Sequence, residues 1–251
     1  HLTRSITSTD RTKFQNIYLL LQTVGIKGRK DQRNYCLLFG LAKDPPARKA
    51  PPARYRAGMD HARLGRSGLQ VSRLCLGTMT FGLQSDESTA FAILDRAAEG
   101  GIDFLDTSDA YPLGGDLSTR GVTEEILGRW LRGRRDRFIV ATKCFAPTGP
   151  APFDGGNSRK HIMSAVEASL RRLQTDYIDL YQLHGYDPNT PIDETLSALD
   201  DLVHQGKVRY TGCSNFLTYQ IVRAVGRSET LGLARFDSVQ PRYNLLFREF
   251  E

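Results

Sequence analysis

The chain has 251 residues, of which 40% are hydrophobic and 25% are charged, as in an ordinary globular protein. Its net charge of +6 is unevenly distributed, because residues 1–58 hold 12 Lys and Arg against 3 Asp and Glu, whereas residues 59–251 hold 22 against 25. The larger part of the chain lacks the excess of basic residues that DNA or RNA requires, so we expect no nucleic-acid partner.

The first 58 residues differ in composition from the rest of the chain. Their run DPPARKAPPARYRAG can bury little apolar surface, which predicts a disordered extension or a linker. The apolar stretch NIYLLLQTVGI is too short and too interrupted to span a membrane, so no membrane partner is expected. Since the first methionine is Met59, we interpret residues 1–58 as an extension before the natural start; an organelle transit segment is the alternative.

The four cysteines indicate a reducing environment. Cys36, Cys75, Cys144 and Cys213 form no CxxC pair, and no histidine lies at a spacing typical of a zinc site. We therefore expect free thiols, a cytoplasmic location and no bound metal.

Strands and helices alternate in the predicted fold from residue 59 onward. A hairpin-like segment, ARLGRSGLQVS, comes first. Short β-branched or apolar runs, separated by amphipathic helical stretches and by Gly, Pro, Ser or Asn, then indicate repeated βα units and a parallel sheet. The six predicted strands cover residues 73–77, 102–105, 138–141, 177–183, 208–213 and 236–240.

Two of the connecting helices carry clear start and stop signals. In NTPIDETLSALDDLVHQG, Thr190 is predicted to cap the helix, Pro191 to occupy its first position, and Gly206 to end it. In the preceding unit, a helix is predicted to start near Ser158. Each helix has an apolar stripe that we assign to the core: Leu196, Leu199 and Val203 in one, and Ile162, Val166, Leu170 and Leu173 in the other.

A polar residue stands at the end of nearly every predicted strand. A barrel gathers such residues from many strands onto one face, whereas an open doubly wound sheet concentrates its site at one switch point. No GxGxxG follows the first strand, so the pattern favours an α/β protein with a (β/α)8 TIM barrel. The residues at the strand ends are Asp106, Lys143, His184, Ser214 with Asn215, and Gln240.

Together with Tyr111, these residues suggest that a carbonyl is reduced by hydride transfer. A phenol is a weak acid at neutral pH, but the ammonium of Lys143 would lower the pKa of Tyr111 toward the working range. Asp106 can pair with Lys143 and keep it charged, and His184 can hydrogen-bond and orient the substrate oxygen. Amide and hydroxyl groups suited to a carboxamide, such as that of nicotinamide, belong to Ser214, Asn215 and Gln240.

Six segments of the chain resemble the aldo-keto reductase family. They are RLGRSGLQVSRLCLGTMTFG, FLDTSDAY, FIVATK, DYIDLYQLHGYDPNTPIDET, GKVRYTGCSNF and VQPRYNLL, and they extend over the chain from Met59 to its end. The resemblance implies a (β/α)8 barrel that uses NADPH, less often NADH, to reduce a small aldehyde or ketone to an alcohol.

The resemblance also implies roles for individual residues. It places the catalytic tetrad at Asp106, Tyr111, Lys143 and His184, with Tyr111 as the general acid. It assigns the nicotinamide end of the cofactor to Thr78, Asp106, Ser214, Asn215 and Gln240.

The chain departs from this family in length. Such a barrel needs eight βα units in roughly 250 residues, but residues 59–251 comprise 193 and end soon after the sixth predicted strand. We therefore expect an incomplete barrel of about six βα units that lacks the last two, and with them the segments that hold the rest of the cofactor.

Two other functions stay open at this stage. One is a catalytically silent binding or regulatory subunit, since barrels of this family also serve as channel-associated subunits; the missing units favour it, and the intact tetrad opposes it. The other is a metal-dependent barrel hydrolase, which Asp106 and His184 suggest. Few further His or Asp ligands stand at the neighbouring strand ends, which disfavours the hydrolase.

Overall fold

An antiparallel hairpin opens the described part of the chain, as predicted. The computed structural model describes residues 58–248. The extension for which we expect disorder, residues 1–58, lies outside this range except for Gly58. Strand β1 (His61–Arg63) pairs with β2 (Gln70–Ser72). The carboxylate of Asp103 joins the hairpin to the main sheet, because it contacts the ring of His61 at 2.7 Å and the backbone N–H of Ser72 at 2.8 Å.

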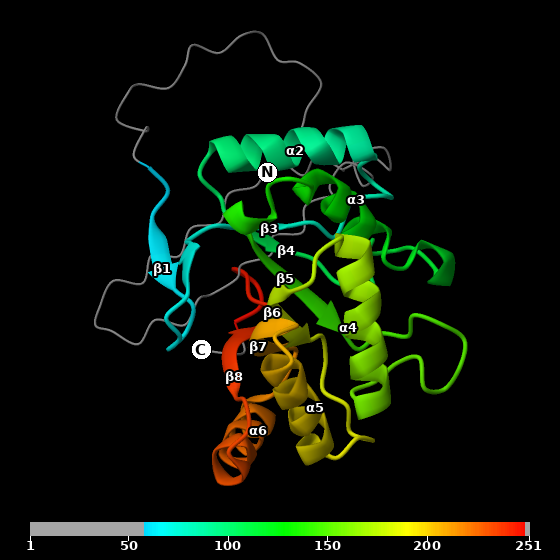
Figure 1. Cartoon of the computed structure of the whole chain (residues 1–251), viewed down its shortest axis with the longest axis vertical. Helices are drawn as coiled ribbons and strands as arrows, with labels where there is room; N and C mark the ends of the chain where they lie inside the picture. The colour runs from blue at the N-terminus through cyan, green and yellow to red at the C-terminus, as the bar shows by residue number, and fades with distance from the viewer. Residues whose placement is uncertain (1–57, 249–251) are drawn as a thin grey trace, which may run out of the picture.

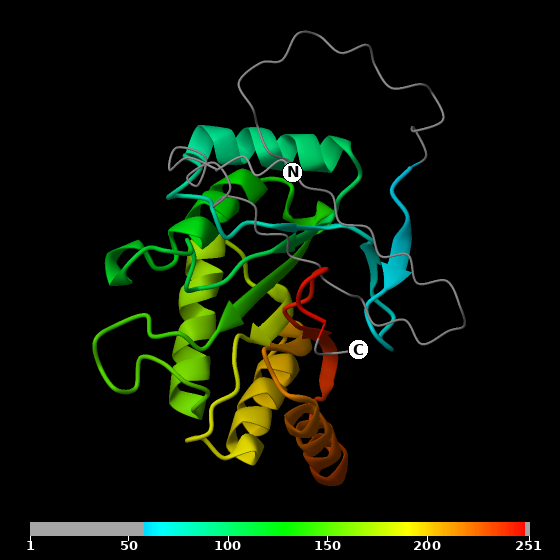
Figure 2. The same cartoon turned by 180° about the vertical axis from the view of Figure 1, so that it is seen from behind.

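Six parallel strands form one curled sheet, in which each strand pairs with the next along the chain. The strands are β3 (Cys75–Gly77), β4 (Phe104–Asp106), β5 (Ile139–Cys144), β6 (Ile178–Leu183), β7 (Val208–Ser214) and β8 (Phe236–Gln240). The helices between them are α2 (Glu87–Glu99), α3 (Val122–Leu131), α4 (Arg159–Leu173), α5 (Ile192–His204) and α6 (Thr218–Leu231). The helices lie along the outer side of the sheet (Figure 1 and Figure 2), so the fold is an incomplete (β/α)8 barrel, as expected.

The inner face of the sheet changes from apolar to polar along the strands. Phe104, Ala141 and Leu180 are buried on this face, together with Leu64 and Val71 of the hairpin. Side chains two positions apart in a strand share a face. The side chains that follow on this face, toward the carboxyl ends of the strands, are therefore those of Asp106, Lys143 and Gln182.

The outer face of the sheet packs against the helices. Leu105, Val140 and Leu183 alternate with the inner residues, and they belong to a large buried cluster. The apolar stripes of α4 and α5 contribute to the same cluster, which confirms their assignment to the core. The members with no exposed surface in this cluster are Ile162, Val166 and Leu199, and Leu196, equally buried, belongs to a smaller cluster with Ile192 and Ala224.

The helix starts agree only in part with the sequence-based expectation. Ser158 caps α4, because its Oγ accepts a hydrogen bond from the backbone N–H of His161 at 3.3 Å. The cap predicted at Thr190 is wrong: its hydroxyl donates to Asp187 at 2.7 Å, and Pro191 is the N-cap of α5. Gly206, with φ 73°, follows the end of α5 as predicted. Within residues 58–248, none of the helices has the length and apolar character needed to cross a bilayer.

The first two strands of the sheet are displaced from their predicted limits. The strand predicted at residues 73–77 begins at Cys75, because the backbone N–H of Arg73 is bonded to the carbonyl of Asp60 at 2.8 Å. The strand predicted at residues 102–105 extends through Asp106, which pairs with Gly77 and Ala141. The carboxylate of Asp106 is therefore placed by the sheet itself.

Candidate active site

A buried ion pair at the carboxyl ends of β4 and β5 forms the centre of the candidate site. Nζ of Lys143 donates to the two carboxylate oxygens of Asp106 at 2.7 and 2.6 Å, and to the carbonyl of Thr107 at 2.9 Å. Both side chains of the pair are 1% exposed. Burial is the largest single effect and disfavours the charge of Lys143, but Asp106 and Tyr111 together outweigh it and raise the pKa of the ammonium above its usual 10.5. The predicted pair is present, and Lys143 stays charged at physiological pH.

Tyr111 and His184 lie beside this ion pair. Nζ of Lys143 is 5.2 Å from the ring centroid of Tyr111. The ring of His184 meets the ring of Tyr111 edge-on, with 5.7 Å between the centroids. Tyr111 is buried, and His184 is partly buried. The structure therefore brings together the four side chains that the sequence motifs place in a tetrad.

The phenol of Tyr111 titrates differently from the expectation. We expected Lys143 to lower its pKa toward the working range, but the pKa of Tyr111 is raised above its usual 10.0. Removal of the phenol from water is the larger effect, and the attraction of Lys143 for the phenolate offsets it only in part, because Asp106 repels the phenolate. Tyr111 is therefore protonated at neutral pH, as a proton donor must be before it reacts.

His184 is neutral at physiological pH. Burial, reinforced by the charges of Lys143 and Arg120, lowers the pKa of its ring to about 3. Its Nδ1 lies 3.1 Å from Oγ of Ser108. A neutral imidazole keeps one N–H, which can donate a hydrogen bond to a substrate oxygen.

The residues expected at the nicotinamide end also gather at the carboxyl ends of the strands. Oγ1 of Thr78 donates to the carbonyl of Asp106 at 2.9 Å, and Oγ of Ser214 donates to the carbonyl of Gln240 at 2.8 Å. Asn215, at φ 58°, donates from Nδ2 to Oγ of Ser214 at 3.1 Å. These bonds leave Oδ1 of Asn215 as an acceptor, and Nε2 of Gln240, 3.5 Å from Asp106, as a weakly held donor. An acceptor and an amide donor complement a carboxamide.

Three polar residues of this region have no part in the sequence-based site. Gln182 is 2% exposed, and its Nε2 lies 3.4 Å from Oδ1 of Asp106 and 3.3 Å from Oε1 of Gln240. Ser108 and Asp109 are fully buried. The sequence does carry a signal for them: Gln182 interrupts the apolar end of its strand, and Ser108 and Asp109 belong to the polar run directly after β4.

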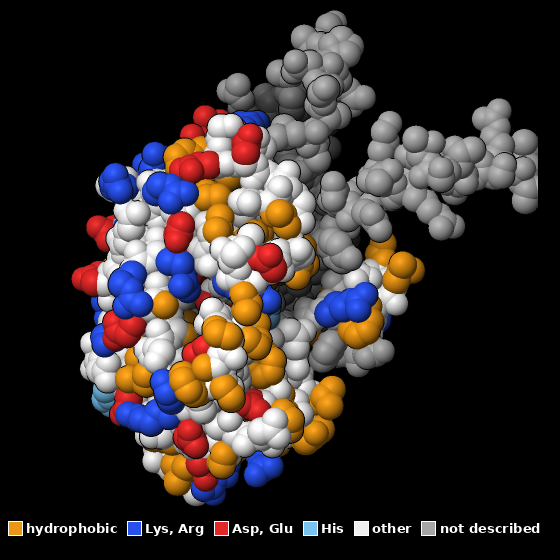
Figure 3. Space-filling view, turned by 90° about the vertical axis from the view of Figure 1, so that its right-hand side faces the viewer, with side chains coloured by type: hydrophobic (Ala, Val, Ile, Leu, Met, Phe, Trp, Pro, Cys, Tyr) orange, Lys and Arg blue, Asp and Glu red, His pale blue; other side chains and the backbone are white. Residues whose placement is uncertain are grey.

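Hydrophobic side chains gather on the face formed by the loops at the carboxyl ends of the strands. Figure 1 shows the loops after β4 and β5 at the right, and Figure 3 turns this side toward the viewer, with hydrophobic side chains across its middle. The polar cluster is therefore accompanied by an apolar rim. Large hydrophobic residues that are exposed in the loops after β3, β4, β5 and β7 are Leu83, Leu113, Leu117, Phe153 and Leu217.

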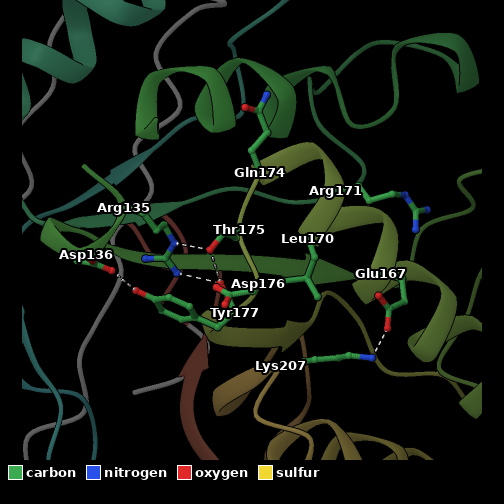
Figure 4. Close-up of a pocket in the computed structure, with 10 residues that line it drawn as sticks. All are labelled: Arg135, Asp136, Glu167, Leu170, Arg171, Gln174, Thr175, Asp176, Tyr177 and Lys207. Carbon is green, nitrogen blue, oxygen red and sulfur yellow. Dashed lines mark hydrogen bonds and ion pairs between the residues drawn. The ribbon is translucent and has the colours of Figure 1, made fainter. Parts of the chain in front are cut away.

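An open groove of about 730 Å³ lies at the opposite, amino end of the strands. Figure 4 shows that residues just before β5, β6 and β7 line it. Arg135 donates to the carboxylate of Asp179 at 2.7 Å and to the carbonyl of Tyr177 at 3.0 Å, and Lys207 pairs with Glu167. In (β/α)8 barrels the catalytic residues lie at the carboxyl ends of the strands, whereas residues at the amino ends contribute to stability. We therefore place the candidate site with Asp106 and Lys143, not in this groove.

The fold and the site together define a class of protein: an incomplete (β/α)8 barrel with a buried lysine–carboxylate pair, a phenol and an imidazole at the carboxyl ends of its strands. Among residues 58–248, no group of three or more His, Cys, Asp and Glu side chains is arranged to hold a metal ion. The model of the aldo/keto reductase family matches residues 73–251. The chain belongs to this family, which confirms the resemblance seen in the sequence motifs.

Curated proteins similar to the chain agree with this assignment. The chain is 43% identical over 201 residues to the uncharacterized oxidoreductase YrpG of Bacillus subtilis strain 168, over 77% of this chain and 60% of the relative. It is 38% identical over 217 residues to protein tas of Escherichia coli strain K12, over 77% and 62%. It is also 38% identical over 194 residues to a probable voltage-gated potassium channel subunit beta of Arabidopsis thaliana, over 76% and 57%. The matched part of each relative is thus about 60% of its length.

Proposed function

We propose that this chain carries the reducing site of a nicotinamide-dependent carbonyl reductase, in which an aldehyde or ketone becomes an alcohol. The observation that carries the proposal is the ion pair of Lys143 and Asp106, 1% exposed, beside Tyr111 and His184. Family membership and the similarity to a relative named as an oxidoreductase support this reaction class.

The proton donor in this proposal is Tyr111. Its raised pKa keeps the phenol protonated until negative charge develops on the carbonyl oxygen. The phenolate that then forms is stabilised by the ammonium of Lys143, which Asp106 holds in place and keeps charged. The neutral ring of His184 donates a second hydrogen bond to the same oxygen and orients it.

The cofactor in this proposal is NADPH, with NADH as the alternative, and it would supply the hydride to the carbonyl carbon. Oδ1 of Asn215 and Nε2 of Gln240 would hold its carboxamide, since they offer one acceptor and one donor. Thr78 and Ser214 would lie against the same end of the cofactor. Their hydroxyls donate to the backbone carbonyls of Asp106 and Gln240, respectively.

The substrate in this proposal has an apolar body next to its carbonyl group. The rim of exposed hydrophobic side chains, which includes Leu113, Leu117 and Phe153, offers apolar surface beside the polar cluster. Burial of apolar substrate surface against such a rim is favourable. An aromatic or aliphatic aldehyde or ketone fits this combination better than a sugar or a charged compound.

The test is the loss of reduced-nicotinamide absorbance when the chain, completed by the two βα units that the barrel lacks, is mixed with NADPH or NADH and a reactive aromatic aldehyde. Tyr111→Phe is expected to slow the reduction by about 10²- to 10⁴-fold. Cofactor binding, followed by fluorescence titration, is expected to stay near the parent value, because the hydroxyl acts in the transition state. A variant that reduces the aldehyde at the parent rate would contradict the assignment of Tyr111.

A regulatory role is the second candidate, and one comparison favours it. The Arabidopsis relative, 38% identical to this chain, is named as a probable potassium channel subunit. In that case the same titration would detect bound cofactor, but the parent chain would not reduce any aldehyde. Cofactor binding combined with turnover favours the reductase, and cofactor binding without turnover favours the regulatory subunit.

A further inference from the structure

Three side chains form a hydrogen-bonded series behind the candidate site. Oγ of Ser108 lies 3.1 Å from Nδ1 of His184 and 3.2 Å from Oδ1 of Asp109. The same Oγ accepts a hydrogen bond from the backbone N–H of Ala110 at 3.2 Å. Ser108 has a single hydroxyl proton, and the carbonyl of Lys143, at 3.5 Å, is the most distant of its three acceptors. The proton therefore goes to His184 or to Asp109, but not to both.

Asp109 occupies a site that disfavours a negative charge. Its side chain is fully buried, and its Oδ2 has no hydrogen-bond partner among the described residues. Neither nearby cation forms an ion pair with it: Arg172 donates to Glu124 at 2.7 Å, and Arg120 donates to the carbonyl of Ala110 at 2.7 Å. A buried carboxylate with neither an ion pair nor a full set of hydrogen bonds is costly, whereas the neutral acid is not. Burial, followed by repulsion from Glu124, raises the pKa of Asp109 to about 8.

A partly enclosed cavity of about 200 Å³ borders Asp109 on the side of α4. Asp154 and Lys160 also line this cavity, which gives the carboxyl group a route to solvent protons. The charged and titratable groups that face Asp109 from the elements around it are Glu124 on α3, Arg172 and His161 on α4, Arg120 and Tyr111 in its own loop, Cys144 on β5 and Tyr181 on β6.

The protonation of Asp109 decides the direction of the series. When Asp109 is neutral, its carboxyl O–H donates a hydrogen bond to Oγ of Ser108. The hydroxyl of Ser108 then donates to Nδ1 of His184, and the ring proton of His184 is on Nε2. When Asp109 is ionised, it accepts the hydroxyl of Ser108. Ser108 then accepts from Nδ1–H of His184, and Nε2 is left without a proton. Each state uses one ring proton, so only the first offers Nε2–H to a substrate oxygen.

We propose that Asp109 and Ser108 are positioning residues that hold His184 in the tautomer with its proton on Nε2. Neither residue touches the substrate; both act through the ring of His184. The inference rests on the proposed function for the use of that proton, but the tautomer itself can be measured without cofactor or substrate. A failure of the Tyr111→Phe test would therefore leave this measurement unaffected, and the two proposals can fail separately.

The test is a long-range proton–nitrogen correlation spectrum of the full chain with isotope-labelled histidine. The signals of His184 are identified by their absence in His184→Gln. Between the pKa of His184, about 3, and the pKa of Asp109, about 8, we expect the pattern of a neutral ring with the proton on Nε2. Above the pKa of Asp109, the pattern is expected to shift toward the tautomer with the proton on Nδ1.

Two variants separate this role from a purely structural one. Asp109→Asn offers an amide N–H to Ser108 as the neutral acid does, so it should keep the Nε2–H tautomer and lose the change near the pKa of Asp109. Ser108→Ala removes the connection, so His184 should become a mixture of tautomers that does not respond to Asp109. Asp154→Asn, in the same cavity but outside the series, is the matched control and should reproduce the parent spectrum.

Two results would overturn the proposal. One is a parent chain whose His184 carries its proton on Nδ1 at neutral pH. The other is an unchanged tautomer and pH response in Ser108→Ala, once circular dichroism shows a parent-like fold. If Ser108→Ala does not fold, Asp109→Asn decides alone, because a retained pH response in that variant also contradicts the proposal.

Discussion

The two ends of the barrel strands each carry an ion pair, but the pairs differ in burial and in their further partners. At the amino end, Arg135 and Asp179, 13% and 12% exposed, bond to the backbone as well as to each other. Arg135 donates to the carbonyl of Tyr177, and Asp179 accepts from the N–H of Val140 at 2.9 Å. At the carboxyl end, Lys143 and Asp106, 1% exposed, make two hydrogen bonds to each other, and Lys143 donates one more to the carbonyl of Thr107. Among the described residues, the further contacts of the Asp106 carboxylate are with side-chain amides, those of Gln182 and Gln240, and not with backbone N–H groups.

Under the proposed function, the pair at the amino end holds the strands in place, whereas the pair at the carboxyl end acts in the reaction. The pair at the amino end makes hydrogen bonds to backbone groups where β5 and β6 begin. Its removal would leave those backbone groups without hydrogen-bond partners. The pair at the carboxyl end stands next to a phenol and a neutral imidazole, whose protons it can influence. A phenol lies beside both pairs, because Cζ of Arg135 is 4.1 Å from the ring centroid of Tyr177. The feature that distinguishes the carboxyl end is the neutral imidazole of His184 against the ring of Tyr111.

The largest effect is expected from Lys143→Met, which keeps most of the side-chain length and removes the charge. It leaves the carboxylate of Asp106 buried without its partner, which should cost about 3–5 kcal/mol of stability. Aldehyde reduction should be lost, because nothing stabilises the phenolate of Tyr111. Denaturant unfolding and the absorbance assay measure the two effects.

The double variant Lys143→Met with Asp106→Asn is the control for this prediction. Removing the second charge should recover part of the stability, because no buried carboxylate is left alone. It should recover none of the reduction. A double variant that reduces aldehydes would show that the pair only supports the fold.

A smaller effect is expected from the matching substitution at the amino end, Arg135→Met. The variant removes the charged hydrogen bonds to Asp179 and to the backbone, which should cost about 1.5–3 kcal/mol. Aldehyde reduction per folded molecule should stay at the parent rate. Denaturant unfolding combined with the absorbance assay tests this, and a loss of turnover beyond the unfolded fraction would remove the distinction between the two ends.

The smallest effect, taken over one pH unit, concerns the pH dependence of stability at the carboxyl end. The pKa of Asp109 is about 8 in the folded protein, against a usual value of 3.8. Between these values the unfolded chain releases the proton and the folded chain keeps it, so the stability that neutral Asp109 contributes falls as the pH rises. Asp109→Asn does not titrate, so its stability should increase relative to the parent by at most about 1.4 kcal/mol per pH unit. A difference that stays constant across this range would contradict the neutral state of Asp109.

The sequence predicts the barrel and the meeting of its polar residues because both follow from periodicity. Asp106, Lys143 and His184 each stand at the end of a strand, and parallel strands bring their carboxyl ends to one edge. The strand at Phe236–Gln240 has the limits predicted from the sequence. Local patterns of this kind do not depend on the packing of particular helices against the sheet.

What the sequence does not predict depends on contacts between distant segments. The raised pKa of Tyr111 results from the balance of burial against Lys143, which a motif does not contain. Ser108 becomes relevant only because the fold places it against Nδ1 of His184. Thr190 has the chemistry of a cap, but the carboxylate of Asp187 takes its hydroxyl. In each case a tertiary contact competes with a local preference.

The most direct test of the account applies one substitution to a tyrosine at each end of the barrel. Tyr111 lies beside Lys143 at the carboxyl end, and the hydroxyl of Tyr177 bonds to Asp136 at 3.2 Å at the amino end. The measurement is the single-turnover rate of aldehyde reduction with saturating reduced cofactor. The account predicts a loss of about 10²- to 10⁴-fold for Tyr111→Phe and the parent rate for Tyr177→Phe. Equal rates in the two variants would contradict the claim that the carboxyl end carries the chemistry.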